Sequence, residues 1–521
     1  MMRERIEQAL QQILPDTTFV VERPRALEHG DYSTNAALVA KIDPQELAGK
    51  LKIEGVEKVE VVGKFINFFL TRDKLTPKEQ KIPQLYAGKK IMVEYTDPNP
   101  FKEFHIGHLV GNVIGEAVAR LFEATGAAVS RANYQGDVGV HVAKAIWGKM
   151  QNPKSSWGEA YTYGDSQYES HKEEIDTLNK TIYEKSDTAV NKLYDEGRAQ
   201  SLEHFEEIYK VLGTKFVFYF FESETGPKGI EIVRKHPEVF EESEGAVVFK
   251  GEQYGLHTRV FINSKGLPTY EAKELGLAEI KQQKGSFDLS ITITAHEISE
   301  YFKVVRKAAE LVFPNLEGRM LARFHGFLRL TTGKMSSRKG NVITGESLIE
   351  DLTEVARGRQ DVAVGAIKYM LLKSGVARDI IFDPEQSLSL EGDSGPYLQY
   401  ALVRARALLR KAKEVGVDPS EWAQDGRRSG ALAQVLPSPM VPLARVLVHY
   451  SDAVARAAKE MEPHYVTTYL TELAAAFNSW YAQEKVIGGE HQDYGLFLTQ
   501  TVEHTLSQGL HLLGIPTPEE M

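Results

Sequence analysis

The spacing of apolar residues changes twice along the chain and divides it into three parts. Residues 1–85 combine one amphipathic helical pattern with short alternating runs, which is typical of a small α+β unit. Over residues 86–384, apolar runs of strand length alternate with helical patterns, the order expected of a parallel sheet. Residues 385–521 are almost wholly helical and predict a bundle.

The clearest supersecondary unit opens the central part. A β-rich run at 91–95 leads into a loop that contains Pro98 and Pro100, and a helical pattern then ends at Gly126. A second β-rich run follows at 128–134. Together these segments predict a βαβ unit with two parallel strands.

The rest of the central part is less regular. Residues of about 150–250 are polar and helical, and they predict an insertion between two halves of the sheet. We expect the sheet to resume at 258–262 and 288–294, because each of these runs precedes another helical pattern.

Composition narrows the possible functions. Hydrophobic residues make up 42% of the chain and charged residues 26%, as in an ordinary folded protein. The net charge of −10 means that any contact with nucleic acid must be local. The absence of cysteine excludes disulfides and thiolate sites. No run approaches the ~20 apolar residues of a membrane span, and the first residues lack a secretory core, so we expect a cytoplasmic protein without membrane contact.

His105, Ile106, Gly107 and His108 lie where the loop after the first central strand enters its helix. Parallel sheets bind phosphates at this position. Two imidazoles one helical turn apart, beside a glycine, suit a polyanion whose charge grows during a reaction. A chance match and a metal-binding pair are the alternatives. A metal pair usually needs a third ligand, and no dedicated metal site is expected.

A second motif, residues 333–341, places three cations and two hydroxyls between flanking glycines. It includes Lys334, Lys339, Ser336 and Ser337, and it has no apolar periodicity. Alone, such a segment is as readily a solvated basic turn as a site. Paired with the histidine turn, it predicts two cationic elements that close on the triphosphate of ATP.

The two motifs, H-I-G-H and K-M-S-S, are the signatures of class I aminoacyl-tRNA synthetases, and the chain resembles the arginyl-tRNA synthetase family in particular. Seven ordered stretches between residues 28 and 482 carry the resemblance: EHGDYSTNAA, GKFINFFL, VEYTDPNPFKEFHIGHL, NYQGDVGVHVAK, KMSSRKGNVI, SGPYLQYALVRARALLRKA and YLTELAAAFNSWY. The resemblance implies an α/β fold, with a Rossmann-like catalytic domain over 86–384, a small N-terminal α+β domain and an all-α C-terminal bundle.

The resemblance also implies an activity. ATP and L-arginine would form arginyl-adenylate and pyrophosphate, and arginine would then pass to the 2′-hydroxyl of the terminal adenosine of tRNA(Arg). His105, His108, Lys334 and Lys339 would be the catalytic residues. The ATP-binding residues would include further members of both motifs, namely Gly107, Met335, Ser336 and Ser337. Mg²⁺ would be carried with ATP rather than held in a protein cage.

Recognition of arginine requires carboxylates, because a guanidinium keeps its charge and presents a planar fork of donors. The resemblance implies that Glu94 and Asn99 hold the backbone of the amino acid. Glu222 and Glu274 would hold the guanidinium, with Tyr270 alongside.

One departure from the family pattern concerns this pocket. The family often shows Tyr-x-x-Arg-Asp, whereas this chain has Lys273 and Glu274 at the last two positions, so the longer acid changes the expected geometry. His296 is a further candidate contact for adenine or the amino acid, and it is equally well interpreted as a structural histidine.

A local basic surface is predicted on helix 397–413, which keeps its apolar residues on one side. Arg404, Arg406 and Arg410 lie around the rest and could neutralise tRNA phosphates. The resemblance places the C-terminal domain at the anticodon and the N-terminal domain at the tRNA elbow.

Three other residues have open roles. Asn35 is a candidate elbow contact, although its motif could equally form a turn and a helix cap. Phe477 and Trp480 fit the apolar stripe of their helix, which favours core packing over base stacking. The resemblance to the family also suggests that the protein is a monomer.

Three alternatives compete with this interpretation. Another synthetase with the same two motifs would keep the histidines and lack the paired acids. A catalytically idle tRNA-binding paralogue is disfavoured because both motifs are intact. A histidine metallohydrolase lacks further ligands and leaves the lysine motif unexplained.

Overall fold

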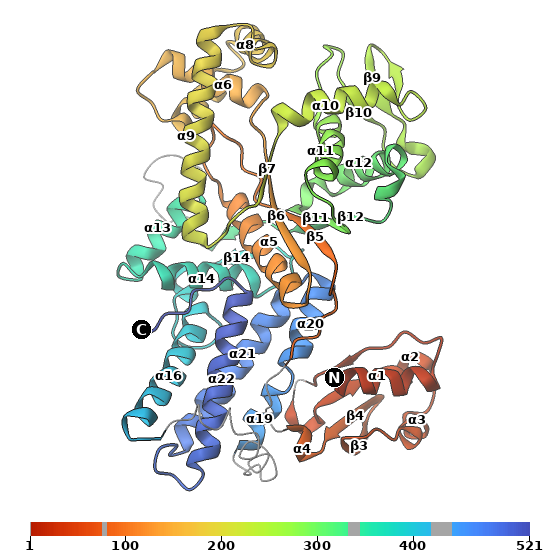
Figure 1. The fold of residues 1–521 in the computed structure, drawn as a ribbon, viewed down its shortest axis with the longest axis vertical. Coiled ribbons are helices and arrows are strands. Elements are labelled where there is room, and N and C mark those ends of the chain that lie inside the picture. The colour runs from red at the N-terminus through yellow and green to blue at the C-terminus, as the bar shows by residue number, and fades with distance from the viewer. Residues whose placement is uncertain (1, 25, 76–80, 332–343, 418–439) are drawn as a thin grey trace.

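The chain folds into three parts that follow one another along the sequence (Figure 1). The computed structural model describes residues 2–24, 26–75, 81–331, 344–417 and 440–521. The parallel sheet of the central part lies at the middle of the molecule. The C-terminal helices lie below it in the view, beside the small N-terminal unit. Within the described residues, no helix is long and apolar enough to cross a bilayer.

The N-terminal unit is an antiparallel sheet packed against helices. Its strands occur in the order β1 (Val21–Glu22), β2 (Tyr32–Thr34), β4 (Phe65–Leu70) and β3 (Val56–Val62). Its helical segments are α1 (Met2–Ile13), η1 (Leu27–His29), α2 (Ala36–Ala40), α3 (Pro44–Lys50) and α4 (Arg72–Leu75). The core includes Ile6 and Phe68, both fully buried. The α+β prediction is therefore confirmed.

The central sheet is wholly parallel, as predicted. Its five strands occur in the order β12 (Met320–His325), β11 (Leu289–Ala295), β5 (Lys90–Glu94), β6 (Ala128–Gln135) and β7 (Phe218–Phe221). Successive side chains of a strand point to opposite faces. Ile91 and Val93 belong to the core shared with α5 (Ile106–Ala124). Met92 belongs to the core shared with α11 (Tyr270–Lys284) and α12 (Ser299–Val312). The sheet is thus covered by helices on both faces, as in Rossmann-like folds.

The predicted βαβ unit is confirmed, but one predicted strand belongs elsewhere. Residues 259–262 form β10 (Arg259–Ile262), which pairs antiparallel in a separate sheet with β9 (Ala246–Phe249) and, beyond it, β8 (Glu241–Ser243). One of the two edge strands of the main sheet is instead β7, which lies inside the segment expected to be helical; the other edge strand is β12. A short apolar run looks the same whether it is a buried strand or part of a helix. The sequence pattern therefore did not distinguish β7 from the helices around it.

The segment between β6 and β7 is helical. It forms α6 (Val140–Gln151), α7 (Trp157–Gln167), α8 (Lys172–Glu184) and α9 (Thr188–Leu212), which share a core of their own. After β7 come α10 (Glu222–Lys235) and η2 (Gly251–Tyr254). Later short elements are η3 (His296–Ile298), η4 (Pro314–Leu316), the parallel pair β13 (Leu328–Leu330) and β14 (Ile380–Phe382), α13 (Gly345–Val355), α14 (Gln360–Leu372) and α15 (Pro384–Ser387).

The C-terminal part is a helical bundle, as predicted. Its helices are α16 (Gly395–Glu414), α19 (Val441–Leu447), α20 (Tyr450–Glu460), α21 (His464–Gln483) and α22 (Gln492–Leu512). Phe477 and Trp480 of α21 are 0% and 5% exposed, so their predicted place in the core is confirmed.

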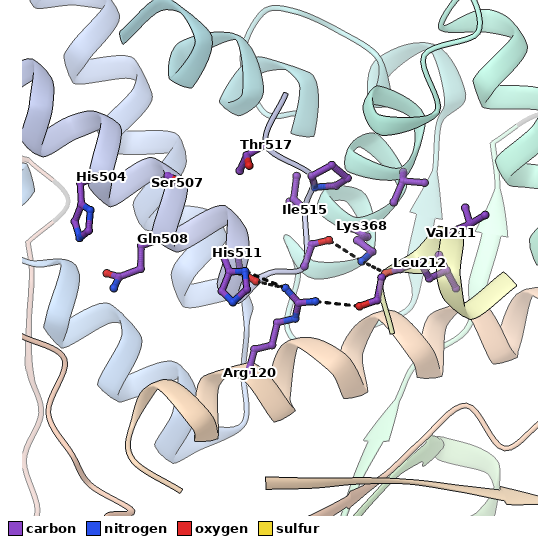
Figure 2. A pocket seen from close by; sticks show the side chains of 14 residues that line it. Arg120, Val211, Leu212, Lys368, His504, Ser507, Gln508, His511, Ile515 and Thr517 are labelled. Atoms are coloured by element: carbon purple, nitrogen blue, oxygen red, sulfur yellow. Dashed lines mark hydrogen bonds between the residues drawn. The ribbon is translucent and has the colours of Figure 1, made fainter. Parts of the chain in front are cut away.

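The bundle is joined to the central part where several helices end. The Lys368 ammonium of α14 donates to the carbonyls of Leu212 and Gly514, at 2.6 Å each. The Arg120 guanidinium of α5 donates to the carbonyls of Gly213 at 3.1 Å and His511 at 2.8 Å, as Figure 2 shows. Cations close to helix C-termini are stabilising. The ends of α9 and α22 are thus fixed against α5 and α14.

Candidate active site

The site is placed by the topology of the sheet. From the central strand β5 the chain runs to β6 on one side and later returns to β11 on the other. In open parallel sheets, ligands bind at the carboxyl ends of the two strands that flank such a switch. Glu94 ends β5 and is 1% exposed. The hydroxyl of Thr292, its neighbour on β11, donates to it at 3.1 Å.

The loop that follows β5 has a strained backbone. Thr96, Asp97 and Phe101 have φ values of 82°, 46° and 71°, in the region that favours glycine. The amide of Tyr134 on β6 donates to Asp97 Oδ1 at 2.8 Å, and the amide of Phe101 donates to Ser201 Oγ on α9 at 2.9 Å. Such strain persists only where neighbours enforce it, and it is concentrated at functional sites.

The histidine turn begins α5. His105 is the N-cap, and its Nδ1 accepts a hydrogen bond from the Gly107 amide at 3.1 Å. Its ring stacks on His108, with the two centroids 3.5 Å apart. Burial and the Lys102 ammonium lower the pKa of His105. Burial and the neighbouring His105 lower the pKa of His108 further. Both imidazoles are therefore neutral at neutral pH and can donate an N–H to a phosphate.

The lysine motif lies outside the described residues, and with it the candidates Lys334, Met335, Ser336, Ser337 and Lys339. The residues directly after it are described. Thr344 forms a β-bridge with His105, and the Gly345 amide donates to the Phe104 carbonyl at 2.8 Å. The chain thus returns from the motif to a point beside the histidine turn.

Two of the predicted arginine-binding residues meet at Gly136. A Cβ atom at this position would lie 2.3 Å from Asn99 Oδ1 and 3.5 Å from the Glu222 carboxyl carbon, so a larger residue would displace the Asn99 side chain. Glu222 begins α10 and is 6% exposed. It pairs with the Lys273 ammonium at 2.6 Å.

Glu274 differs from the other two predicted arginine-binding acids, Glu94 and Glu222, and resembles buried Asp97, whose pKa is also raised by burial and by Glu94. Burial raises its pKa to about 8, with a further contribution from nearby Glu94. Glu94 pairs with Lys281 at 2.8 Å. Among the described residues, no Lys or Arg pairs with Glu274. Its carboxyl group is therefore a place where an added cation would be stabilised.

The last two predicted substrate contacts lie near the rim. Tyr270 begins α11 and is 63% exposed, and the Lys273 ammonium lies 5.1 Å from its ring centroid. His296 follows β11 and is exposed, and its ring meets Phe324 edge-on at 6.5 Å. The structure thus brings Tyr270 to the acids, whereas the described ring contact of His296 is on the side of the edge strand.

Two further residues were missed by the sequence reasoning. Asp137 is fully buried and holds the start of α10. It accepts hydrogen bonds from Ser223 N at 2.8 Å, Ser223 Oγ at 2.7 Å and Arg198 Nε at 2.9 Å. The G-D-V-G sequence could have indicated a buried acid in a turn. Lys102, whose charge acts on both histidines and on Glu222, has no comparable sequence signal.

The candidate tRNA contacts occupy different environments. Arg404 donates to Asn478 at 2.7 Å, and Arg406 pairs with Glu503 at 3.0 Å and Glu519 at 2.9 Å. Arg410 is exposed on α16. Asn35 Oδ1 accepts from the Val20 amide at 2.9 Å, which favours a structural role.

Comparisons with known proteins cover the whole chain. Residues 1–70 match the arginyl tRNA synthetase N terminal domain, residues 71–383 the catalytic domain of class I (R) tRNA synthetases, and residues 398–521 the DALR anticodon binding domain. An arginine–tRNA ligase of Limosilactobacillus reuteri is 30% identical over the full length of both chains.

Solved structures agree with these matches. The arginyl-tRNA synthetase of Thermus thermophilus superposes with a TM-score of 0.82, at 25% identity and full coverage of both chains. That of Plasmodium falciparum, at 18% identity, shares the fold with a TM-score of 0.80 over all of this chain and 98% of its own. The chain therefore belongs to the arginyl-tRNA synthetase family of class I enzymes, which use ATP to ligate arginine to tRNA.

Proposed function

We propose that both steps of arginylation take place at the switch point between β5 and β11, with the ATP phosphates held between the two motifs. His105 and His108 would donate hydrogen bonds to the α-phosphate as charge develops there, while Lys334 and Lys339 would bind the pyrophosphate side. Gly107, Met335, Ser336 and Ser337 would complete the nucleotide contacts, and Mg²⁺ would arrive with ATP. The bridge between Thr344 and His105 supports this proposal, because Thr344 is only three positions beyond the lysine motif in the sequence and lies at the histidine turn.

The acids would select arginine. Glu274 would bind the guanidinium because, of the three predicted arginine-binding carboxylates, it has no paired cation among the described residues, and Glu222 would share its carboxylate between the substrate and Lys273. Tyr270 would cover the guanidinium from the rim. Glu94 and Asn99 would bind the amino-acid backbone, next to the α-phosphate that its carboxylate attacks.

The three parts would divide the work on tRNA. We assign contact with the elbow to residues 1–85, chemistry to 86–384 and anticodon binding to 385–521, with Arg410 on the exposed side of α16 and the enzyme acting as a monomer. Local positive charge on an acidic protein makes tRNA binding strongly dependent on salt.

Exchange of labelled pyrophosphate into ATP tests the proposal. The protein is mixed with ATP, total tRNA and each amino acid in turn. Label should enter ATP with arginine and only when tRNA is present. Exchange with another amino acid would refute the assignment of Glu274 and Glu222, and exchange without tRNA would refute the tRNA requirement.

A further inference from the structure

A hollow lies beside the edge strand β12 of the central sheet. It has a volume of about 590 Å³ and lies between α12, η2 and the edge strand β12. Pockets of about 300–1,000 Å³ hold ligands of nucleotide size, whereas a nucleic-acid duplex needs a far wider surface. The hollow is too small for a duplex and large enough for one or two bases.

Aromatic side chains line this hollow from two sides. Phe324 on β12 meets Phe302 on α12 edge-on, with centroids 6.0 Å apart. Tyr254 at the end of η2 is 40% exposed, and its ring is parallel to that of Phe249, 5.8 Å away. Bases of single strands stack on exposed aromatic rings whatever their identity, because every base has a π face.

Cations line the same hollow. Lys303, Arg306 and Lys307 recur at helical spacing, so they share one face of α12. The Lys307 ammonium lies 4.9 Å from the ring centroid of Tyr254. Glu310 is the one acid of the lining, and its carboxylate lies 3.7 Å from Arg306. Lys303 also pairs with Glu300 of the same helix at 2.6 Å, so three cations meet two acids and leave a net local charge of +1 on a chain whose net charge is −10.

The hollow lies next to the candidate active site. Phe324 pairs in register with Thr294 of β11, two residues beyond Thr292, which bonds Glu94. His296, which directly follows β11, also meets the Phe324 ring edge-on. Adjacent strands are about 4.8 Å apart, so about 10 Å separates β12 from β5.

We propose that this hollow binds the single-stranded 3′ end of tRNA, at the nucleotides that precede the terminal adenosine. Their bases stack on Tyr254 and Phe324, and their phosphates meet the cations of α12. The terminal adenosine then continues past His296 to the carboxyl ends of β11 and β5. The inference rests on the ligase function, and it assigns a path to a part of the substrate that the histidine turn and the acids do not hold.

The test compares two tRNAs, one intact and one without its single-stranded 3′ end, by their affinity over a range of salt concentrations. The triple variant Lys303→Gln, Arg306→Gln and Lys307→Gln should bind intact tRNA about tenfold more weakly. It should also show a salt slope smaller by about 2, the value for three phosphate contacts on a single strand. Its affinity for truncated tRNA should equal that of the unaltered protein.

A matched variant removes the same charge elsewhere. Arg410→Gln, Lys411→Gln and Lys413→Gln neutralise three exposed cations of α16, and should change the affinity for the two tRNAs by equal factors. Thermal melting checks that both variants fold. If the α12 variant lost affinity for both tRNAs equally, or for neither, the proposal would be wrong.

A second measurement reports on stacking. A 2-aminopurine base placed next to the terminal adenosine should lose fluorescence on binding to the unaltered protein and keep most of it on binding to Tyr254→Leu. Equal quenching by both proteins would contradict the proposal. Charging of intact tRNA with arginine by the unaltered protein tests the ligase function separately, so the two failures can be told apart.

Discussion

Among single residues, the pairing of charges separates Glu274 from Glu222 and Glu94, the other two predicted arginine-binding acids. Glu222 has Lys273 and Glu94 has Lys281, each within 2.8 Å. The Glu274 carboxyl has a pKa of about 8, because burial and the nearby Glu94 disfavour its charged form. In the proposed function, binding of the guanidinium would reverse this preference, so recognition of arginine would be coupled to loss of a proton.

The first prediction concerns the pH dependence of arginine binding. The pKa of the Glu274 carboxyl is about 8, so at lower pH the group is mostly protonated and arginine must displace that proton. The KM for arginine should therefore be about fivefold higher at pH 7 than at pH 8. Glu274→Gln should raise this KM about tenfold or more and remove its pH dependence. Initial rates of exchange measure both effects, and a KM that is flat with pH in the unaltered protein would contradict them.

The raised pKa of Glu274 should also make folding stability depend on pH: arginine binding should improve as pH rises, whereas the stability of the fold should fall. Between its ordinary pKa of 4.5 and about 8, Glu274 binds a proton in the folded state and not in the unfolded state. The unaltered protein therefore loses stability as pH rises through this window. The variant Glu274→Gln has no group that titrates at this position, so it does not show this loss. The Tm of the variant minus the Tm of the unaltered protein should therefore increase from pH 5 to pH 8. A difference in Tm that does not vary with pH would show that the carboxyl titrates normally.

His108 tests the phosphate contacts. Its ring stacks on His105 and is neutral, so its expected role is to donate a hydrogen bond to charge that develops on the phosphate. His108→Ala should lower kcat about a hundredfold and leave the KM for arginine unchanged. A change confined to that KM would instead place His108 in the amino-acid pocket.

Among elements, α5 connects the site to the rest of the protein. His105 begins this helix, and Arg120 near its end contacts the ends of α9 and α22 (Figure 2). Arg120 also pairs with buried Glu116 at 2.6 Å. The position of the histidine turn thus depends on contacts made several helical turns away.

Replacing Arg120 tests this connection. Arg120→Met leaves two helix-end carbonyls and the Glu116 carboxylate short of a donor, at a cost on the order of 2 kcal/mol of unfolding free energy. Arg120→Lys keeps the positive charge but lacks the planar set of guanidinium donors, so it should recover part of the lost unfolding free energy. Denaturant unfolding followed by tryptophan fluorescence measures both variants. Equal stability of all three proteins would mean that the contacts at the end of α5 carry no net energy.

Predictability from sequence also differs between elements. The long periodic patterns of α5, α11, α16 and α21 predicted these helices, since an amphipathic face recurs over several turns. The short apolar run of β7 was included in a helical segment, and that of β10 was assigned to the main sheet. Four residues carry no period of their own, so the sequence could not correct either assignment. Strand β2, with all three residues buried, was hidden in a motif interpreted as a turn.

On the scale of the whole molecule, contacts between distant segments set the arrangement of the three parts. Asp31 of the N-terminal unit pairs with Arg445 of α19 at 2.6 Å, and the Tyr32 hydroxyl donates to Asp452 of α20 at 2.6 Å. These partners are 414 and 420 positions apart. Local patterns carry no information at that separation.

The candidate site shows the same limit. Resemblance indicated Asn99, Glu222 and Glu274 as binding residues, but the backbone approach at Gly136 that brings Asn99 to Glu222 follows only from the folded chain. The ion pairs of Lys273 and Lys281, which leave Glu274 alone, could not be predicted from spacing either.

The central claim is that Glu274, a buried acid without a paired cation among the described residues, selects the positive charge of arginine. Citrulline has nearly the same shape and no charge, so the ratio of kcat/KM for arginine to that for citrulline isolates this selection. The account predicts a large ratio for the unaltered protein and one at least about tenfold smaller for Glu274→Gln, through the KM for arginine. An unchanged ratio in the variant would contradict it.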